Sequence, residues 1–266
     1  MHKLLALLGC CAFGFASAAT VDNQPLSESS PSATSYTLGI AAGAVPKYFG
    51  SKDYHAVALP VFAVTVQDWF FASSTDGIGA RFASPSGLFG SAAVGYDLGR
   101  ADANRTGLPG SDHLRGMGDI KGSVVGIMQL GYAFSPRLSF TSTVRVPLTH
   151  RERGITSRTA MKYDFVKSDR DVVSLDVGVL AGTSKYNQTF FGVTGTQSLS
   201  SGFSEYSSHA GVYAADSKVV WTHKLAPHWS TTSAISVTGL LGDAANSPIV
   251  QRRLSVYALS SINYTF

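Results

Sequence analysis

The stretch Ser260-Ser-Ile-Asn-Tyr-Thr-Phe266, SSINYTF, places apolar and polar side chains at alternating positions. Its apolar side holds Ile262, Tyr264 and Phe266, with serine, asparagine and threonine between them. A period of two residues is typical of a β-strand. Soluble sheets commonly leave a polar, frayed tail, so an aromatic ending within a predicted strand indicates that this strand closes a sheet in a different environment.

The N-terminus predicts export. Lys3 is followed by an apolar run over residues 4–15 and by the small residues Ala16-Ser17-Ala18, the pattern of a secretory signal peptide. The run is too short for a membrane-spanning helix, which needs roughly 20 apolar residues. We expect cleavage after Ala18, with Ala19 as the alternative. A lipoprotein box ending at Cys10 is the rival interpretation. The predicted division is therefore 1–18 signal peptide, 19–35 flexible segment and 36–266 barrel.

Composition narrows the class of protein. Cleavage at the predicted site removes Cys10 and Cys11, the two cysteines of the chain, so no disulfide is expected. The formal net charge of +4 is too small and too dispersed to indicate a nucleic-acid partner. Only 14% of residues are charged, glycines number 27, and the sequence after the signal peptide holds no apolar run of membrane-helix length. An exported, cysteine-free, strand-rich chain favours an outer-membrane β-barrel of Gram-negative bacteria.

Period-two alternation recurs along the chain. Between Arg137 and Leu148, and again between Val173 and Val179, apolar residues alternate with polar ones. Val125 and Ile127 interrupt the polar face of a third such segment. Alternation fits both a soluble sandwich and a membrane barrel. Twelve strands are predicted, at 35–45, 54–66, 69–74, 77–83, 88–98, 120–134, 137–148, 157–167, 171–182, 209–224, 229–240 and 252–266.

Strand length and turn asymmetry favour the barrel. Most of these segments reach the roughly 9 to 11 residues with which a tilted strand crosses a bilayer. The third and fourth are short, so ten strands are an alternative. Tight turns alternate with long loops, which cover 99–119, 149–156, 183–208 and 241–251. Bacterial barrels place short turns in the periplasm and long loops outside, and an even strand number then brings both termini to the periplasmic side.

Aromatic residues add support for a membrane. Trp69, Trp221 and Trp229 all lie within a few residues of a predicted short turn, and amphipathic rings gather at membrane interfaces. Aromatic residues also flank turns in soluble hairpins, which is the competing interpretation. The closing stretch with Ile262, Tyr264 and Phe266 resembles the C-terminal signal read by the barrel-assembly machinery. Because backbone groups in lipid cannot stay unpaired, the last strand is expected to pair with the first.

Four spaced motifs go beyond a generic barrel. They are Pro46 to Ser51 (PKYFGS), Leu114 to Ile120 (LRGMGDI, after Gly99-Arg100), Phe190 to Val193 (FFGV) and Gly242 to Val250 (GDAANSPIV). In this order they resemble the family of outer-membrane proteins named for the MltA-interacting protein and OmpV, over about 36–266. Two positions depart from the family pattern: Phe190 stands where tyrosine is common, and Met117 where leucine is usual.

The resemblance implies a binding function, most simply a scaffold that links a lytic murein transglycosylase and a penicillin-binding protein to the outer membrane. Adhesion at the cell surface and a narrow channel are the alternatives. A channel would be lined by polar residues such as Arg137, Arg145, Asp176, Asp216, Lys121 and Lys218. The candidate binding residues from the motifs are Tyr48, Gly50, Arg100, Arg115, Gly118, Asp119, Phe191, Gly192, Asp243, Ser247 and Pro248.

Simpler interpretations of the same residues remain open. The motif glycines would supply positive φ in tight loops, and Asp243 with Asn246 would form local turn hydrogen bonds. Arg100 and Arg115 would pair with nearby aspartates. The segment Thr149 to Arg170 carries six basic residues and, if it lies outside, would contact lipopolysaccharide phosphates through arginine. An ordinary solvated loop is the alternative.

Catalysis is not predicted. None of the histidines has the spacing of a catalytic triad, and the sequence contains no GxSxG, P-loop or HExxH pattern. No cluster with metal-ligand spacing is present in the sequence, so neither a metal nor another cofactor is expected.

Overall fold

The computed structural model describes residues 34–266. The predicted signal peptide and nearly all of the flexible segment lie outside the described residues. The described chain forms twelve strands: β1 Ser35–Pro46, β2 Tyr54–Val66, β3 Phe70–Ser73, β4 Gly77–Ala83, β5 Leu88–Asp97, β6 Ser123–Ala133, β7 Leu138–Pro147, β8 Thr156–Lys167, β9 Asp171–Gly182, β10 Gly211–Lys224, β11 Trp229–Leu240 and β12 Leu254–Thr265. All twelve predicted strands are confirmed.

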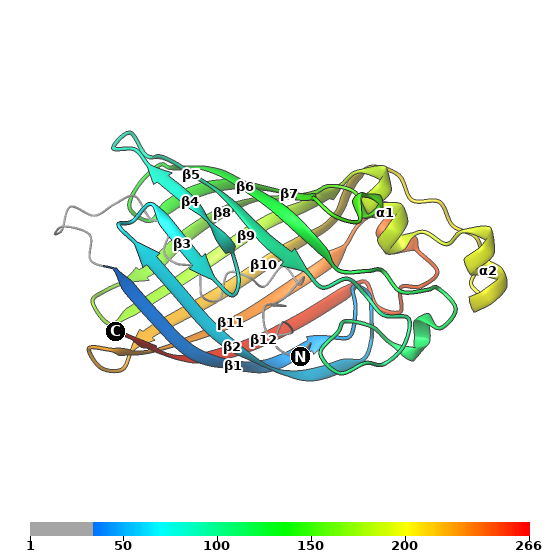
Figure 1. The fold of residues 1–266 in the computed structure, drawn as a ribbon, viewed down its shortest axis with the longest axis horizontal. Helices are drawn as coiled ribbons and strands as arrows, with labels where there is room; N and C mark the ends of the chain where they lie inside the picture. Colours follow the sequence, from blue (N-terminus) through cyan, green and yellow to red (C-terminus); the bar gives the residue numbers. More distant parts are fainter. Residues whose placement is uncertain (1–33) are drawn as a thin grey trace, which may run out of the picture.

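These strands close into one antiparallel barrel in which each strand pairs with its neighbours in the sequence (Figure 1). The seam pairs β1 with β12, in a register that runs from Thr37 opposite Thr265 to Ala44 opposite Ala258. The two threonine hydroxyls are 3.0 Å apart. Closure by the last strand is therefore confirmed, and the alternative of ten strands is wrong.

The barrel is apolar outside and polar inside. Ile40, Leu130 and Ile235, from β1, β6 and β11, are each 55% to 58% exposed, whereas serine, threonine and charged residues at the alternate positions point inward. A soluble protein would bury such large apolar side chains because burial stabilises each by roughly 1.5–3 kcal/mol. The fold is therefore a transmembrane β-barrel, and the competing soluble sandwich is wrong.

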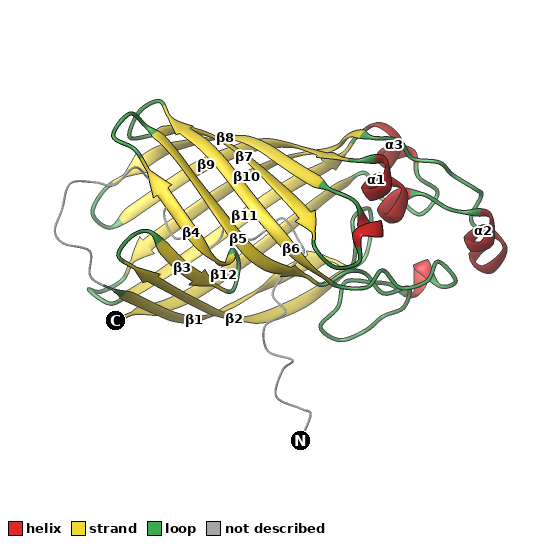
Figure 2. Ribbon diagram, turned by 45° about the horizontal axis from the view of Figure 1, so that its top comes forward, coloured by secondary structure: helices red, strands yellow, loops and turns green. Residues whose placement is uncertain are grey.

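The two ends of the barrel differ (Figure 2). One end carries only tight turns and the C-terminus, and the other carries the long loops with all the helices. The helices are α1 Ser184–Phe191, α2 Gly195–Ser201, α3 Gly242–Asn246 and the 3-10 turns η1 Asp112–Leu114 and η2 Arg151–Arg153. Within residues 34–266, no helix is long and apolar enough to cross a bilayer. The alternation of tight and long connections is confirmed.

The helices within the loops were not predicted, although local signals exist. Thr183 caps α1 by accepting a hydrogen bond from the backbone of Tyr186. Thr194 and Gln197 form a reciprocal capping box at the start of α2. Both helices are eight residues or shorter and lack a repeated apolar period, so pattern analysis has too few turns to detect them.

Candidate functional site: the loop cap and the lumen

The four sequence motifs meet in one compact body at the long-loop end, which we call the cap (residues 47–53, 98–122, 183–210 and 241–253). The Tyr48 hydroxyl donates to the carbonyl oxygen of Ile249 at 2.7 Å. The Ser247 hydroxyl donates to the carbonyl oxygen of Phe191 at 2.5 Å, and the Gly50 carbonyl accepts the backbone N–H of Gln251 at 2.8 Å. Segments far apart in sequence are thus joined by specific bonds.

The cap has its own apolar interior. One cluster contains Tyr48, Leu114, Met117, Val193 and Ile249. A second joins α1 and α3 to the ends of β9, β10 and β11, through the buried residues Leu180, Tyr186, Phe191, Tyr213, Ala214, Leu240 and Ala244. Because these side chains are nearly all inaccessible to solvent, the cap is a packed body at the long-loop end rather than a set of free loops.

Arg100 is a charged residue that is buried in the cap. Its guanidinium donates from Nη1 to the Phe190 carbonyl at 2.8 Å, while its Nε has no partner among the described residues. Burial lowers the pKa of Arg100 to about 10, and burial likewise raises the pKa of Tyr48. The prediction that Arg100 pairs with an aspartate is wrong, since its partner is the backbone carbonyl of Phe190 within the cap.

The exposed side of the cap carries the remaining charged motif residues. Arg115 binds Asp112 at 3.0 Å, which confirms the predicted pairing, and Asp119 binds Arg105 at 2.8 Å. The backbone N–H of Asp102 is the largest of the influences that lower the pKa of Asp119. Such exposed pairs stabilise a fold by at most about 1 kcal/mol, which leaves these groups accessible to a partner.

Asp243 joins two loops of the cap. Its carboxylate accepts hydrogen bonds from the backbone and the ring Nδ1 of His209, both at 2.8 Å. These bonds, with the backbone bond the stronger influence, lower the pKa of Asp243. Asn246 instead donates to the Gly242 carbonyl at 3.2 Å. The local turn predicted for this pair is therefore confirmed for Asn246 and wrong for Asp243.

The motif glycines serve two different purposes. Gly50 and Gly118 have φ of 92° and 77°, as predicted. Gly192 does not, because its φ is −76°. A side chain at Gly192 would collide with Gln188, so close packing explains this glycine. Pro248 is half-buried between Ser247 and Ile249.

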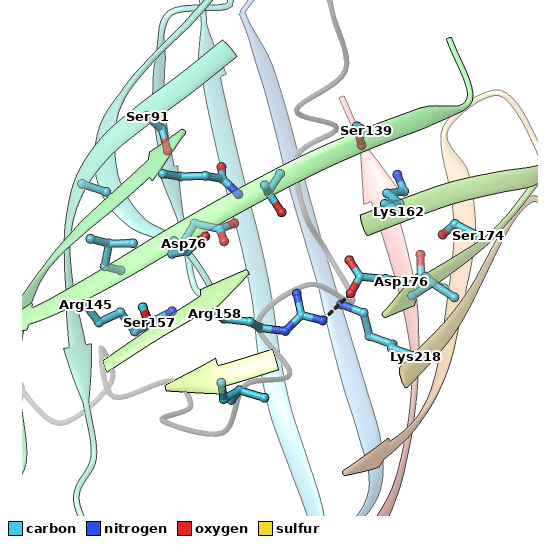
Figure 3. Close-up of a pocket in the computed structure, with 18 of the residues that line it drawn as sticks. Asp76, Ser91, Ser139, Arg145, Ser157, Arg158, Lys162, Ser174, Asp176 and Lys218 are labelled. Carbon is cyan, nitrogen blue, oxygen red and sulfur yellow. Dashed lines mark hydrogen bonds and ion pairs between the residues drawn. The ribbon is translucent and has the colours of Figure 1, made fainter. Parts of the chain in front are cut away.

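Below the cap, the lumen holds a cavity of about 520 Å³ that extends from the short turns to the cap. Its lining includes eight arginines and lysines but four aspartates. Arg158 is the centre of a charge cluster (Figure 3). Its guanidinium donates to Asp216 at 2.8 Å and to Asp176 on the neighbouring strand. Lys162 lies 3.4 Å from Asp164.

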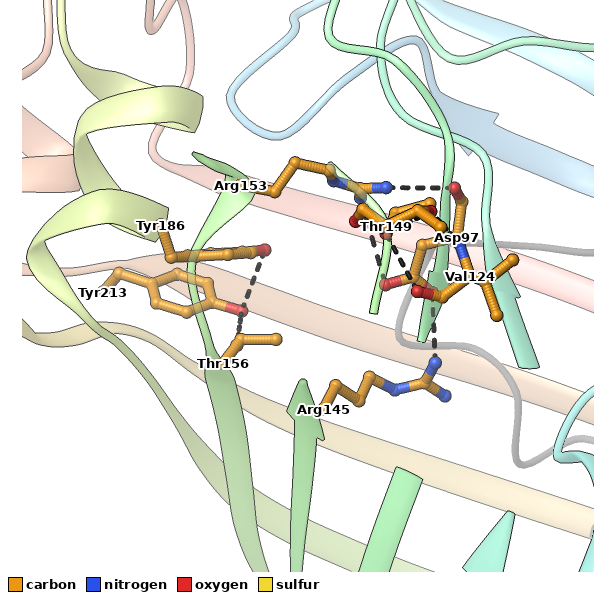
Figure 4. Close-up of polar contacts among 9 residues, drawn as sticks. Asp97, Val124, Arg145, Thr149, Arg153, Thr156, Tyr186 and Tyr213 are labelled. Atoms are coloured by element: carbon orange, nitrogen blue, oxygen red, sulfur yellow. Dashed lines mark hydrogen bonds and ion pairs between the residues drawn. The ribbon is translucent and has the colours of Figure 1, made fainter. Parts of the chain in front are cut away.

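A second cluster lies where the lumen meets the cap (Figure 4). Asp97 binds Arg145 at 3.1 Å, and Arg153 donates to the Asp97 carbonyl at 3.0 Å. Nearby, the hydroxyls of Thr156, Tyr213 and Tyr186 form a chain. These polar bonds join β5 to β7 and to η2, and they join α1 of the cap to β10 and β8.

Two predictions about charged residues need correction. The segment with Arg153, Arg158 and Lys162 is predicted to contact lipopolysaccharide if it lies outside, with a solvated loop as the alternative, but all three side chains line the lumen. The reason is that most of this segment is strand β8, whose inward face alternates with its lipid face. Lys121 was predicted in the lumen, but it is exposed in the loop before β6. Four of the other predicted positions, Arg137, Arg145, Asp176 and Lys218, do line the cavity.

Asp97 and Arg158 were missed as members of a lumen cluster. Their alternation with apolar neighbours on β5 and β8 is a usable signal of inward orientation. Their pairing partners depend on which strands adjoin and in which register, and no local pattern gives that information. Among residues 34–266, no group of three His, Cys, Asp or Glu could hold a metal ion.

The family model described as MltA-interacting protein MipA matches residues 38–266. The chain belongs to the MipA family. The matched residues include the four motifs, and the structure places these motifs in the cap. The chain matches no curated protein compared with it.

Solved structures share the barrel of this MipA family member only distantly. The NanC porin has a TM-score of 0.43 at 10% identity, with 87% of this chain and 99% of that chain covered. The KdgM porin gives 0.42 at 10%, with 86% and 99% covered. The Pseudomonas putida toluene transporter TodX gives 0.40 at 10%, with 89% and 90% covered.

Proposed function

We propose that this protein is an outer-membrane barrel that acts by binding, as an anchor for peptidoglycan-remodelling enzymes at the inner side of the membrane. A lytic murein transglycosylase is the first expected partner, and a penicillin-binding protein is the second. The family description names an interaction with MltA, which supports the proposal. The observation that carries it is the packed cap, because a body of loops with the interior residues Leu114, Phe191 and Ile249, each 0% exposed, at the long-loop end favours binding over conduction.

The short-turn end is the surface that would face the periplasm in this account. Its turns are only three or four residues long, so a periplasmic enzyme would contact a broad, shallow rim. Arg170 and Lys224 lie side by side there, joined by a backbone bond of 2.8 Å. Trp229 also lies at this end. Basic and aromatic side chains are the types that most often anchor interfaces.

An affinity capture from envelope extract tests the proposal. The intact barrel is expected to retain a murein transglycosylase under mild detergent. The double substitution Arg170→Glu with Lys224→Glu should reduce that retention, whereas Arg115→Glu at the opposite end should not. Capture that fails for the intact chain, or that falls only with Arg115→Glu, contradicts the proposal.

A second candidate is a path for small anions, favoured by the excess of arginine and lysine around the cavity. Electrostatic focusing in a low-dielectric channel raises the local concentration of opposite charge. Planar-bilayer recording separates the two functions. Stable, anion-selective single-channel steps would establish conduction, and a silent bilayer with folded protein would eliminate it.

A further inference from the structure

The barrel wall is incomplete beside β2. β3 pairs with β2 only from Ala63 to Val66, and β4 pairs with β5 only up to Val94. Ser74 continues the contact by one residue, since its backbone N–H donates to the Phe62 carbonyl at 3.0 Å. Among residues 34–266, no strand pairs with the outer edge of β2 between positions 54 and 61.

The chemistry of this edge can be deduced from Phe62. Its backbone N–H and C=O both face Ser74, and hydrogen-bonding directions alternate along an antiparallel strand. The backbone groups of Tyr54, Ala56, Ala58 and Pro60 therefore also point away from β1. Pro60 has no N–H to leave unpaired, and proline within sheets is confined to such edges. The sequence is thus adapted to an open edge at this position.

The β3–β4 hairpin, which leaves the wall incomplete, has a turn that is held by specific hydrogen bonds. At its tip the Asp76 carboxylate accepts hydrogen bonds from the hydroxyls of Ser73 and Thr75, at 3.1 and 2.9 Å. Gly77 has φ of 81° and lies against the backbone of Val94. The hairpin therefore ends within the wall because its turn is specified there.

The opening borders the cavity. Its frame consists of the β2 edge, the Ser73–Gly77 turn, the end of β5 and the 98–122 loop, which is tied to Lys47 by a 2.7 Å backbone bond from Gly110. Val61, Asp76, Asp97 and Pro109 belong to this frame and also line the cavity. Two strand positions of about 4.8 Å each are absent from the wall there.

The cavity is amphipathic. Next to the opening its lining includes the apolar residues Val61, Phe71, Ala93 and Ile127, beside the carboxylates Asp76 and Asp97 of the frame. Across the lumen, β7 to β10 supply six further charged side chains. Its volume of about 520 Å³ falls within the range of roughly 300–1,000 Å³ that small-molecule sites occupy.

Lys218 is the charged group best placed to receive a ligand. It is 4% exposed and lines the cavity, yet it makes no hydrogen bond to any part of the chain that the structure describes. Figure 3 shows its ammonium group beside Asp176. Asp176 and Asp216 already accept hydrogen bonds from Arg158. The Lys218 ammonium therefore retains donors for an incoming anion.

We propose that the opening beside β2 admits a long-chain fatty acid from the membrane into the lumen. The acyl chain packs on the apolar lining at Phe71, Ala93 and Ile127, and the carboxylate binds Lys218. A single unbranched chain suits the narrow frame, and a carboxylate suits a donor with unfilled hydrogen-bonding capacity. The packed cap makes the membrane, rather than the long-loop end, the source of this ligand.

Native mass spectrometry of the full-length barrel released from nanodiscs that contain palmitate tests the proposal. One palmitate is expected to bind per barrel. Lys218→Met should weaken binding about tenfold or more, the loss expected for a charge-assisted bond. The matched variant Lys162→Met, which removes another lumen ammonium, should leave binding unchanged, and hexanoate should not bind. Circular dichroism on both variants verifies that they fold.

Four results would overturn the proposal. They are absence of a palmitate adduct on the folded protein, equal loss in the two lysine variants, equal binding of hexanoate, and binding that appears only after residues 19–33 are deleted. The last result would identify the chain's own N-terminal segment as the occupant of the lumen. None of these results bears on capture of a murein transglycosylase.

Discussion

The hydroxyl of Tyr48 donates a 2.7 Å hydrogen bond to the carbonyl oxygen of Ile249, although 201 positions separate the two residues. Both are almost completely buried. This contact connects the loop after β1 with the loop before β12, so it joins two distant parts of the chain within the cap. The motif residues therefore stabilise the cap, in addition to any binding in which they take part.

Tyr48→Phe tests that contact. Loss of the hydroxyl leaves the Ile249 carbonyl unpaired in a buried site, so the free energy of unfolding should fall by about 0.5–1.5 kcal/mol. Urea unfolding in detergent micelles, followed by circular dichroism, measures the change. Tyr36→Phe is the control, because the Tyr36 side chain lies at the lipid surface and is 51% exposed. Equal losses in the two variants would refute a special role for the Tyr48 bond.

Arg158→Gln tests the charge cluster in the lumen. The substitution leaves Asp176 and Asp216 close together without their shared guanidinium, so unfolding should become easier by about 3–5 kcal/mol. Arg105→Gln, which breaks an exposed pair, should cost no more than about 1 kcal/mol. Replacing both aspartates by asparagine in the Arg158→Gln background should restore part of the stability. A loss no larger than that of Arg105→Gln would contradict this account.

Acid should loosen the cap through Asp243. The pKa of Asp243 in the folded protein lies below the ordinary value of 3.8. The ionised carboxylate therefore stabilises the folded cap fully above pH 3.8, and this stabilisation disappears as the pH falls through the lowered pKa. Hydrogen exchange over residues 203–211 should therefore be faster in Asp243→Asn than in the natural chain at neutral pH. The two proteins should converge in strong acid. A difference that persists unchanged at pH 2 would argue against the linkage.

Phe266→Ala tests the proposed insertion signal. The ring is 64% exposed and stabilises the finished barrel little, so refolding into detergent should be nearly unchanged. Assembly in cells should fall several-fold if the barrel-assembly machinery reads this residue. Leu254→Ala removes another exposed side chain from β12 and should assemble normally. Normal cellular levels of the Phe266 variant would eliminate the signal.

Most of the fold could be predicted from the sequence because strand alternation and turn chemistry are local. The strand at Asp171–Gly182, for example, has the predicted bounds. The cap could not be predicted, because the contact between Tyr48 and Ile249 depends on how the ten strands between them in the sequence are arranged. The opening beside β2 has one local signal in the sequence, Pro60 within an otherwise regular strand. Proline indicates a strand edge, but whether that edge is unpaired depends on how far β3 extends. Likewise, the partners of Arg158 depend on which strands adjoin β8 and in which register, and its local sequence does not give that information.

The central claim is that alternate side chains face lipid and water, and cysteine scanning along β9 tests it most directly. Single cysteines at positions 173 to 180, in a chain with Cys10 and Cys11 replaced by serine, would be reacted with a water-soluble maleimide in liposomes. We predict that cysteines at Ser174 and Asp176 react from the lumen. Those at Leu175 and Val177 should be protected and should respond to lipid-bound quenchers. Uniform reactivity, or protection of the opposite set, would contradict the account.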